Sequence, residues 1–302
     1  MVGERDKSIW LLMWMPPKAL PATGSPALVA ASTATLELNP NSSSSKSTVS
    51  ITALQNPSSS LASSSDYNNG TGGVSGFSAC ETDDEAKMLR IGLVKPEVIS
   101  WSPRITVLHN FLSSEECDHL MAIGRPRLQR SKVHDMKTGK GIVSDTRTSF
   151  ETSLSKEESK NLIVQAIEKR ISVFSQVPVE NGETIRVIRY EKNQYFRLHR
   201  DYIIDTVNLQ NGGQRIATML MYLSDDVEGG ETYFPMAGTG KCSCGGKMLK
   251  GMSVKPIKGD ALLFWSVGLD GKEDPKSVHT GCEVLSGEKW SATKLMRQNK
   301  YC

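Results

Sequence analysis

The sequence predicts an α+β fold in which short strands form a sandwich or jelly roll, flanked by helices and preceded by a low-complexity region. Three observations predict it. Ser, Thr, Asn and Gly fill most of positions 41–80, which cannot bury enough apolar surface to offset the entropy of ordering. Two capping motifs announce helices between residues 113 and 175, and short β-favouring runs separated by Gly-rich breaks follow from Ile185 onward. We therefore expect a disordered N-terminal region, residues 1–82, and a folded domain, residues 83–302.

Composition limits the classes of partner. With 302 residues, of which 38% are hydrophobic, the chain can form one large domain or two smaller ones. The net charge is only +3, and no Lys/Arg run forms a phosphate-binding stripe. The sequence therefore predicts no nucleic-acid partner.

An apolar patch at residues 9–15 is stopped by Pro16 and Pro17, far short of the ~20 apolar residues that a membrane-spanning helix needs. The patch is either a remnant of a signal or anchor, an interfacial segment, or a few hydrophobic residues in a disordered terminus. No convincing transmembrane anchor, and hence no membrane association through this terminus, is evident from the sequence.

Two helices precede the strands. Ser113 and Glu116 have capping-box spacing, which predicts a helix that runs to about Gly124. Ser155 and Glu158 have the same spacing and predict the start of a second helix. The apolar residues of this second helix share one face, which we expect to pack on the sheet: Leu162, Ile163, Ala166, Ile167, Ile171 and Phe174.

Between these helices, residues 137–141 and 145–149 are rich in Gly, Lys and polar residues. They form either a flap over an active site or a solvated hairpin.

The β-rich half carries eight candidate strands after a first strand at 105–108. They cover residues 185–190, 195–199, 216–223, 232–234, 253–257, 261–265, 277–281 and 290–295. A double sheet of this kind holds ligands between its walls, and we expect His199 and His279 at the ends of neighbouring strands.

Six cysteines are too few for a disulfide scaffold at this length. Cys242 and Cys244 form the one close pair, for which a structural thiol or a disulfide fits better than a metal site. In an oxidising compartment the candidates for pairing are Cys117, Cys242, Cys244 and Cys282, and the sequence leaves their connectivity open.

The strongest chemical signal is His199-Arg200-Asp201 together with the distant His279. Alternate side chains of an extended segment share a face, so His199 and Asp201 can point to one centre. Two histidines and one carboxylate form the open-sided ligand set of non-haem Fe(II) oxygenases. Lys289, ten positions after His279, suits the far carboxylate of a dicarboxylic cosubstrate. The alternatives are structural histidines and a surface lysine.

Several blocks in this half resemble plant prolyl 4-hydroxylases, which are 2-oxoglutarate- and Fe(II)-dependent dioxygenases. The blocks are residues 214–223, 228–232, 258–264, His279 and residues 287–294, and the resemblance extends from about Ile91 to the C-terminus. It implies a distorted double-stranded β-helix, or jelly roll, as the catalytic domain. It does not cover the first 80 or so residues.

The resemblance also implies roles for named residues. His199, Asp201 and His279 would hold Fe(II), and Lys289, Tyr190 and Thr232 would bind the C5 carboxylate of 2-oxoglutarate. With O2 as the other cosubstrate and L-ascorbate to rescue oxidised iron, the reaction would yield peptidyl 4-hydroxyproline, succinate and CO2. Tyr190 and Thr232 could equally be ordinary strand residues.

The implied substrate is a proline-rich peptide, in hydroxyproline-rich glycoproteins, held in the extended polyproline II conformation. The residues that match peptide contacts of the family are Arg147, Ser149, Glu183 and Arg215, which otherwise read as polar surface residues. The implied location is the lumenal side of the endoplasmic reticulum or Golgi.

Three positions depart from the family pattern. Leu198 replaces a proline before the first iron histidine, Arg200 stands where the family often has His or Tyr, and Leu295 replaces a tryptophan near the peptide groove. Two alternatives remain: the same oxidative chemistry on a lysine side chain or nucleobase, and an inactive module that binds proline-rich peptides. A panel of substrates and oxygen consumption with 2-oxoglutarate distinguish them.

Overall fold

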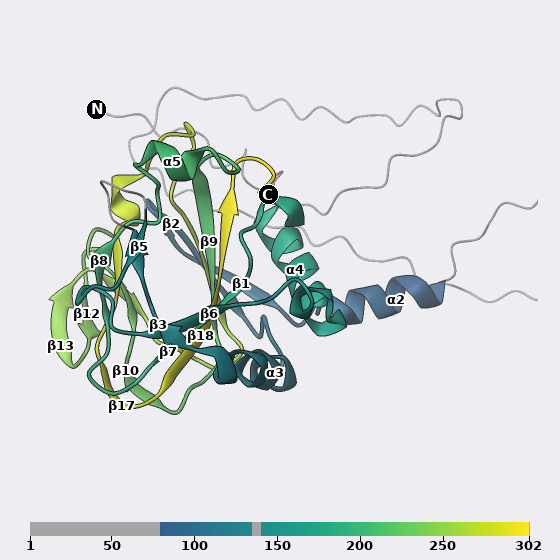
Figure 1. Ribbon diagram of the computed structural model, residues 1–302, viewed down its shortest axis with the longest axis horizontal. Helices are drawn as coiled ribbons and strands as arrows, with labels where there is room; N and C mark the ends of the chain where they lie inside the picture. The colour runs from purple at the N-terminus through teal and green to yellow at the C-terminus, as the bar shows by residue number, and fades with distance from the viewer. Residues whose placement is uncertain (1–78, 135–139, 302) are drawn as a thin grey trace, which may run out of the picture. The chain divides into compact units, whose positions relative to one another are not determined.

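A large antiparallel sheet runs through the part of the chain that the computed structural model describes, residues 79–134 and 140–301 (Figure 1). Within these residues it has eight strands in the order β1-β2-β15-β9-β18-β7-β6-β3. The strands are β1 (Lys95–Trp101), β2 (Arg104–His109), β3 (Gln129–Arg130), β6 (Phe150–Ser153), β7 (Arg186–Tyr190), β9 (Arg215–Tyr222), β15 (Ala261–Trp265) and β18 (Lys289–Arg297). Apart from the β1–β2 hairpin, the neighbouring strands are far apart in sequence, so the sheet forms only when most of the domain folds.

The central strands have two different faces because side chains alternate along a strand. On β9, Ala217, Met219 and Met221 point to the hydrophobic core beside the helices. The residues between them point to the other face, where Thr218 and Leu220 line a cleft. This alternation separates the core from the site.

A second, smaller sheet covers the cleft face. Among the described residues it has four strands in the order β14-β11-β16-β8: β14 (Met252–Val254), β11 (Thr232–Phe234), β16 (His279–Gly281) and β8 (Phe196–His199). Phe234 packs edge-on against Phe264 of the large sheet, with ring centroids 5.4 Å apart, inside a second apolar cluster. The two sheets and their helices confirm the predicted α+β jelly roll. The strand predicted at 253–257 ends at Val254. The strand predicted at 277–281 begins only at His279, because the turn Pro275–Ser277 (η4) precedes it.

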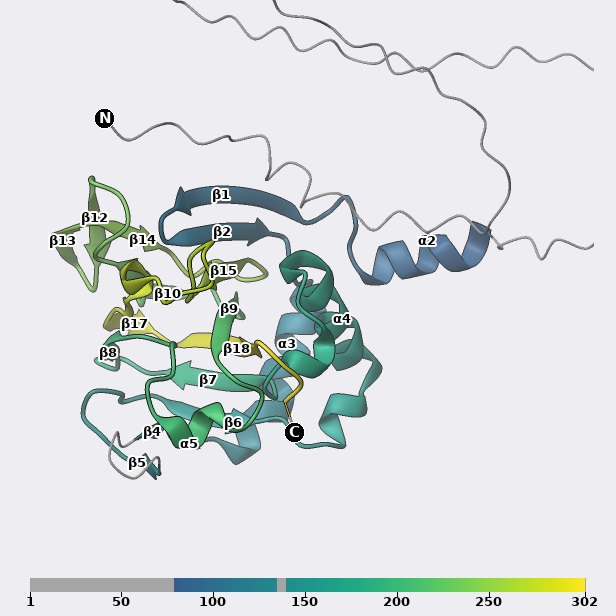
Figure 2. The same cartoon turned by 90° about the horizontal axis from the view of Figure 1, so that it is seen from above.

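Helices α3 (Ser114–Gly124) and α4 (Leu162–Ser175) lie on the opposite side of the large sheet from the small one (Figures 1 and 2). The first of the two begins where the sequence predicts. The Ser113 side chain accepts from the Glu116 N–H, and the Glu116 carboxylate accepts from the Ser113 N–H. Cys117 and Leu120 are fully buried against the sheet.

The predicted start of the second helix is wrong. Ser155 and Glu158 do make the reciprocal capping bonds, but the short 3-10 turn η2 (Glu158–Lys160) follows them instead of the α-helix. The α-helix starts later, where the Asn161 side chain accepts from the Ile163 N–H. As a result Leu162 is 80% exposed, and Val164 takes the buried position in its place.

The remaining elements are small. They are α2 (Ala79–Met88), α5 (Thr206–Leu209), the 3-10 turns η1 (Arg125–Arg127) and η3 (Val179–Asn181), and three two-stranded pairs: β4 (Val133–His134) with β5 (Gly141–Ile142), β10 (Val227–Gly229) with β17 (Val284–Gly287), and β12 (Lys241–Cys244) with β13 (Lys247–Lys250). The three pairs and the strands β1, β3 and β6 were not predicted, because most of them are only two to four residues long.

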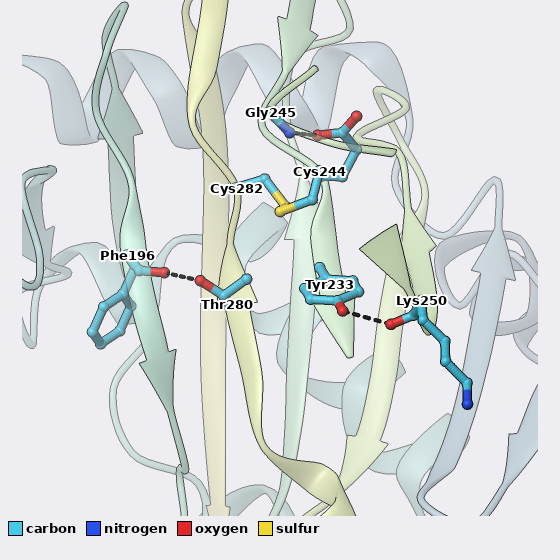
Figure 3. Close-up of a disulfide and its surroundings, with 8 residues drawn as sticks. Phe196, Tyr233, Cys244, Gly245, Lys250, Thr280 and Cys282 are labelled. Atoms are coloured by element: carbon cyan, nitrogen blue, oxygen red, sulfur yellow. Dashed lines mark hydrogen bonds between the residues drawn. A yellow bond between two sulfur atoms is a disulfide. The ribbon is translucent and has the colours of Figure 1, made fainter. Parts of the chain in front are cut away.

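A disulfide joins the β12–β13 hairpin to the small sheet (Figure 3). It links Cys244 to Cys282, the residue that follows β16. The sequence left the connectivity of the four candidate cysteines open, and the other two, Cys117 and Cys242, are free thiols. The predicted low-complexity region lies outside the described residues up to position 78, as do residues 137–139 of the predicted flap. In the described ranges we find no helix with the length and apolar character needed to cross a membrane.

Candidate active site

His199 and His279 face each other across two neighbouring strands. Strands β8 and β16 pair antiparallel with His199 directly opposite His279, as the sequence predicts. The Thr280 hydroxyl donates to the Phe196 carbonyl at 2.5 Å, which ties the strands together beside the histidines (Figure 3). The two imidazole ring centroids are 4.2 Å apart.

Asp201 completes the group. One ligand atom from each of His199, Asp201 and His279 lies within 4.8 Å of the others. The Nε2 atoms of His199 and His279 are each 3.9 Å from a different oxygen of the Asp201 carboxylate. Two imidazoles and one carboxylate on one side of a centre fit a divalent iron ion with open positions on its other side.

Hydrogen bonds fix how the three groups point. The Nδ1 atom of His199 lies 2.8 Å from the Arg197 carbonyl, and that of His279 lies 3.0 Å from the Ser277 carbonyl. A carbonyl only accepts, so each Nδ1 carries a proton and each Nε2 presents its lone pair to the centre. The Thr218 hydroxyl donates to Asp201 Oδ2 at 2.6 Å and holds the carboxylate in place.

The electrostatics favour the metal-binding protonation states. Burial, together with the adjacent His279, lowers the pKa of His199 to about 3. Burial alone would raise the pKa of Asp201, but the two imidazoles and the Thr218 hydroxyl outweigh it, so the pKa lies below its usual value. At neutral pH the site thus offers a neutral imidazole at His199 and a carboxylate at Asp201.

Lys289 lies deeper in the same cleft and carries a buried charge. Its side chain is almost fully buried, and within the described ranges no hydrogen-bond acceptor or ion-pair partner reaches its Nζ. Burial lowers the pKa of Lys289 to about 8, partly offset by Glu231. A buried ammonium without a partner calls for an anion, and the cleft is where one can enter.

Tyr190 and Thr232 lie beside this ammonium. Tyr190 pairs directly with Lys289 across β7 and β18, and the Lys289 Nζ is 5.6 Å from the centroid of the Tyr190 ring. The Thr232 hydroxyl is 2.9 Å from that of Tyr222, and both Tyr190 and Thr232 line the cleft. The arrangement fits a small dicarboxylate with one end at Lys289 and the other at the triad.

The cleft has a volume of about 480 Å³, enough for such a molecule and part of a larger one. Of the four predicted peptide contacts, Arg147 and Arg215 line it. Ser149 does not: it is fully buried, with its hydroxyl 2.8 Å from that of Ser131. Glu183 is buried too and accepts from Arg215 Nε at 2.6 Å and Arg297 Nε at 2.7 Å.

The three departures from the family pattern all lie at the cleft. Leu198 is 58% exposed, Leu295 is buried in the wall, and Arg200 pairs with Glu273 at 2.6 Å. None of them displaces a side chain of the triad.

Sequence reasoning missed several supporting residues. Thr218 and the aromatic rings around the histidines were not identified. The Phe196 ring stacks on the His199 ring with centroids 3.5 Å apart, and the Phe264 ring lies edge-on to the His279 ring with centroids 4.6 Å apart. The two-residue period of β9, which buries Ala217 and Met219, could have placed Thr218 on the opposite face, toward the site.

Comparison with known proteins agrees with this geometry. A family model described as the 2OG-Fe(II) oxygenase superfamily matches residues 185–297. Prolyl 4-hydroxylase 1 of Arabidopsis thaliana is 69% identical over 216 residues, which span 72% of this chain and 76% of the relative. Probable prolyl 4-hydroxylase 8 of the same plant is 50% identical over 215 residues, 68% of this chain and 72% of the relative.

Among solved structures, the viral collagen prolyl hydroxylase of Paramecium Bursaria Chlorella virus-1, in a 2OG complex, is similar at 28% sequence identity with a TM-score of 0.48. The match covers 64% of this chain and 95% of that one.

Proposed function

This chain belongs to the prolyl 4-hydroxylases of the 2OG-Fe(II) oxygenase superfamily, and we propose that it converts peptidyl proline to 4-hydroxyproline at the cleft around His199, Asp201 and His279. The reaction consumes 2-oxoglutarate and O2 and releases succinate and CO2. The observation that carries the proposal is one cleft holding both the His-Asp-His group and the buried, unpaired Lys289. Residues 83–302 form the catalytic domain in this proposal.

His199, Asp201 and His279 hold the iron through two Nε2 atoms and a carboxylate oxygen. When bound, Fe(II) supplies the oxidising chemistry that no protein side chain provides. The protein's part is orientation and exclusion of water. Thr218 and the carbonyls of Arg197 and Ser277 fix the ligand geometry, and the rings of Phe234 and Phe264 enclose His279.

Lys289 binds the C5 carboxylate of 2-oxoglutarate, with Tyr190 and Thr232 as hydrogen-bonding neighbours. The carboxylate supplies the charge that the buried ammonium lacks, and the ammonium repays the desolvation of the carboxylate. Because Lys289 and the triad lie in one cleft, a five-carbon diacid can reach both at once.

The substrate is a proline-rich segment in polyproline II conformation, as in hydroxyproline-rich glycoproteins. Such a segment makes no internal hydrogen bonds and exposes its ring edges to an enzyme. Arg147 and Arg215 face the cleft and contact the peptide directly. Ser149 and Glu183 are positioning residues: Glu183 holds the guanidinium of Arg215, and Ser149 anchors the segment that carries Arg147.

The proposal is tested by turnover of a poly-proline peptide with Fe(II), 2-oxoglutarate and ascorbate, which we expect to restore iron oxidised in uncoupled cycles. Succinate release and a mass gain of one oxygen per modified proline are expected, and both are lost in His279→Ala. Protein that binds iron and 2-oxoglutarate but leaves every proline peptide unmodified contradicts the proposal.

We place the enzyme on the lumenal side of the endoplasmic reticulum or Golgi. Its support is the Cys244–Cys282 disulfide, because such bonds persist in oxidising compartments. Co-fractionation with endoplasmic reticulum or Golgi markers of the protein expressed in plant cells tests this location, and a fully cytosolic protein with reduced cysteines overturns it.

A further inference from the structure

The mouth of the cleft carries an excess of basic side chains. Besides Lys289, the basic residues that line it are Lys132, Arg147, Arg186, Arg197, Arg200 and Arg215. The acidic residues that line it are Asp201, which belongs to the triad, and Asp205, which caps α5 by accepting from the Asn208 N–H at 2.8 Å.

Most of these cations are already neutralised. Arg147 donates to Glu151 at 2.5 Å, Arg200 pairs with Glu273 at 2.6 Å, and Arg215 pairs with Glu183 at 2.6 Å. Arg186 lies 3.9 Å from Glu151 and 4.0 Å from Glu183. Their charges are directed at the protein itself.

Arg197 and Lys132 differ from the others. Both are exposed at the mouth of the cleft, and neither forms an ion pair within residues 79–134 and 140–301. Arg197 lies two positions before His199 on β8, and both residues line the cleft.

Their geometry is fixed by neutral neighbours. The Arg197 guanidinium lies 4.7 Å above the Tyr195 ring and donates to the Tyr195 hydroxyl at 3.2 Å. The stem of Lys132 packs over Gly141, where an added Cβ would meet the lysine Cδ at 3.2 Å. The Lys132 carbonyl accepts from Arg147 Nη1 at 3.3 Å, which ties its backbone to the wall of the cleft.

We propose that Arg197 and Lys132 select proline-rich substrates that carry an acidic residue beside the target proline. The inference rests on the function proposed above and specifies its substrate class. A carboxylate next to the proline would supply the ion-pair partner that these two cations lack among the described residues, while a lysine there would be repelled. Exposed ion pairs change affinity by about 1.4- to 5-fold each.

The test compares three peptides that differ only in the residues on either side of a single proline, which are Glu, Ser or Lys. Binding is measured by fluorescence anisotropy with iron-free protein, and turnover is measured separately by succinate release. Wild-type protein is expected to bind the Glu peptide about tenfold more tightly than the Lys peptide, with the difference falling at high salt.

Arg197→Glu and Lys132→Glu are each expected to shrink or reverse this preference, whereas Lys247→Gln, at an exposed lysine of the remote β13, should keep the wild-type ratio. Equal affinity of wild-type protein for the Glu and Lys peptides overturns the inference without any variant. Peptides that bind with the expected charge preference but are never hydroxylated overturn the proposed function and leave the inference standing.

Discussion

His199 and His279, 80 positions apart in the chain, are directly paired across the antiparallel strands β8 and β16. Their Nδ1 atoms both donate to backbone carbonyls two positions earlier in the chain. Each strand therefore orients its histidine by the same hydrogen bond, which leaves Nε2 free. The pairing of the two strands then brings the two Nε2 atoms to one point. Asp201 joins them from the bend that follows β8, and the Thr218 hydroxyl donates a hydrogen bond to its carboxylate.

Thr218→Val should weaken metal binding without removing a ligand. The substitution keeps the shape of the side chain but deletes the hydrogen bond to Asp201, and loss of such an outer partner typically costs about 10- to 100-fold in metal affinity. Titration of metal-free protein with Co(II), followed by its absorption spectrum, measures this. Thr106→Val on the remote β2 serves as the matched control; equal metal affinity of the two variants contradicts the assigned role.

Binding of 2-oxoglutarate should weaken as the pH rises above about 8. The pKa of Lys289 is lowered to about 8 by burial, and only the protonated ammonium pairs with a carboxylate. Deprotonation at higher pH therefore reduces affinity, by up to about tenfold per pH unit. Arginine stays charged in this range, so in Lys289→Arg the KM for 2-oxoglutarate should not rise with pH in this way. Parallel pH profiles for wild type and this variant would exclude Lys289 as the titrating group.

Arg170→Met should strongly destabilise the fold. The Arg170 guanidinium is fully buried and bonds both oxygens of Glu116 at 2.8 Å and the Phe111 carbonyl at 2.8 Å. Removal of one partner of a buried pair typically costs about 3–5 kcal/mol. Urea unfolding of this variant, of Glu116→Gln and of the double variant measures the coupling. The neighbouring exposed Lys169→Met should change the free energy of unfolding by less than about 1 kcal/mol.

Loss of the Cys244–Cys282 disulfide should lower the free energy of unfolding by about 2–4 kcal/mol, since the bond closes a 38-residue separation. Cys282→Ser and wild-type protein in dithiothreitol should unfold at the same, lower urea concentration. Cys242→Ser removes a free thiol and should behave as oxidised wild type. Full stability of reduced protein would show that the bond does not hold the β12–β13 hairpin in place.

The sequence predicted the fold class and the candidate ligands because both depend on short-range patterns. The His-x-Asp spacing and the later histidine are both visible locally. The start of α4 was missed because two capping signals compete within seven residues, and Asn161 rather than Ser155 begins the α-helix. Which polar residues face the cleft depends on packing. The sequence predicts both Glu183 and Arg215 as peptide contacts, yet only Arg215 lines the cleft, and Glu183 is buried and accepts a hydrogen bond from it. Pairing of Cys244 with Cys282 likewise requires the fold.

We propose that one cleft binds iron at His199, Asp201 and His279 and a 2-oxoglutarate carboxylate at Lys289. Calorimetric titration of 2-oxoglutarate into metal-loaded protein tests it most directly, with wild type, His279→Ala and Lys289→Ala compared. We expect one binding site in wild type and loss of metal binding in His279→Ala. In Lys289→Ala we expect intact metal binding with at least tenfold weaker 2-oxoglutarate affinity, a loss of about 1.4 kcal/mol of binding free energy. Wild-type affinity for both ligands in either variant would contradict it.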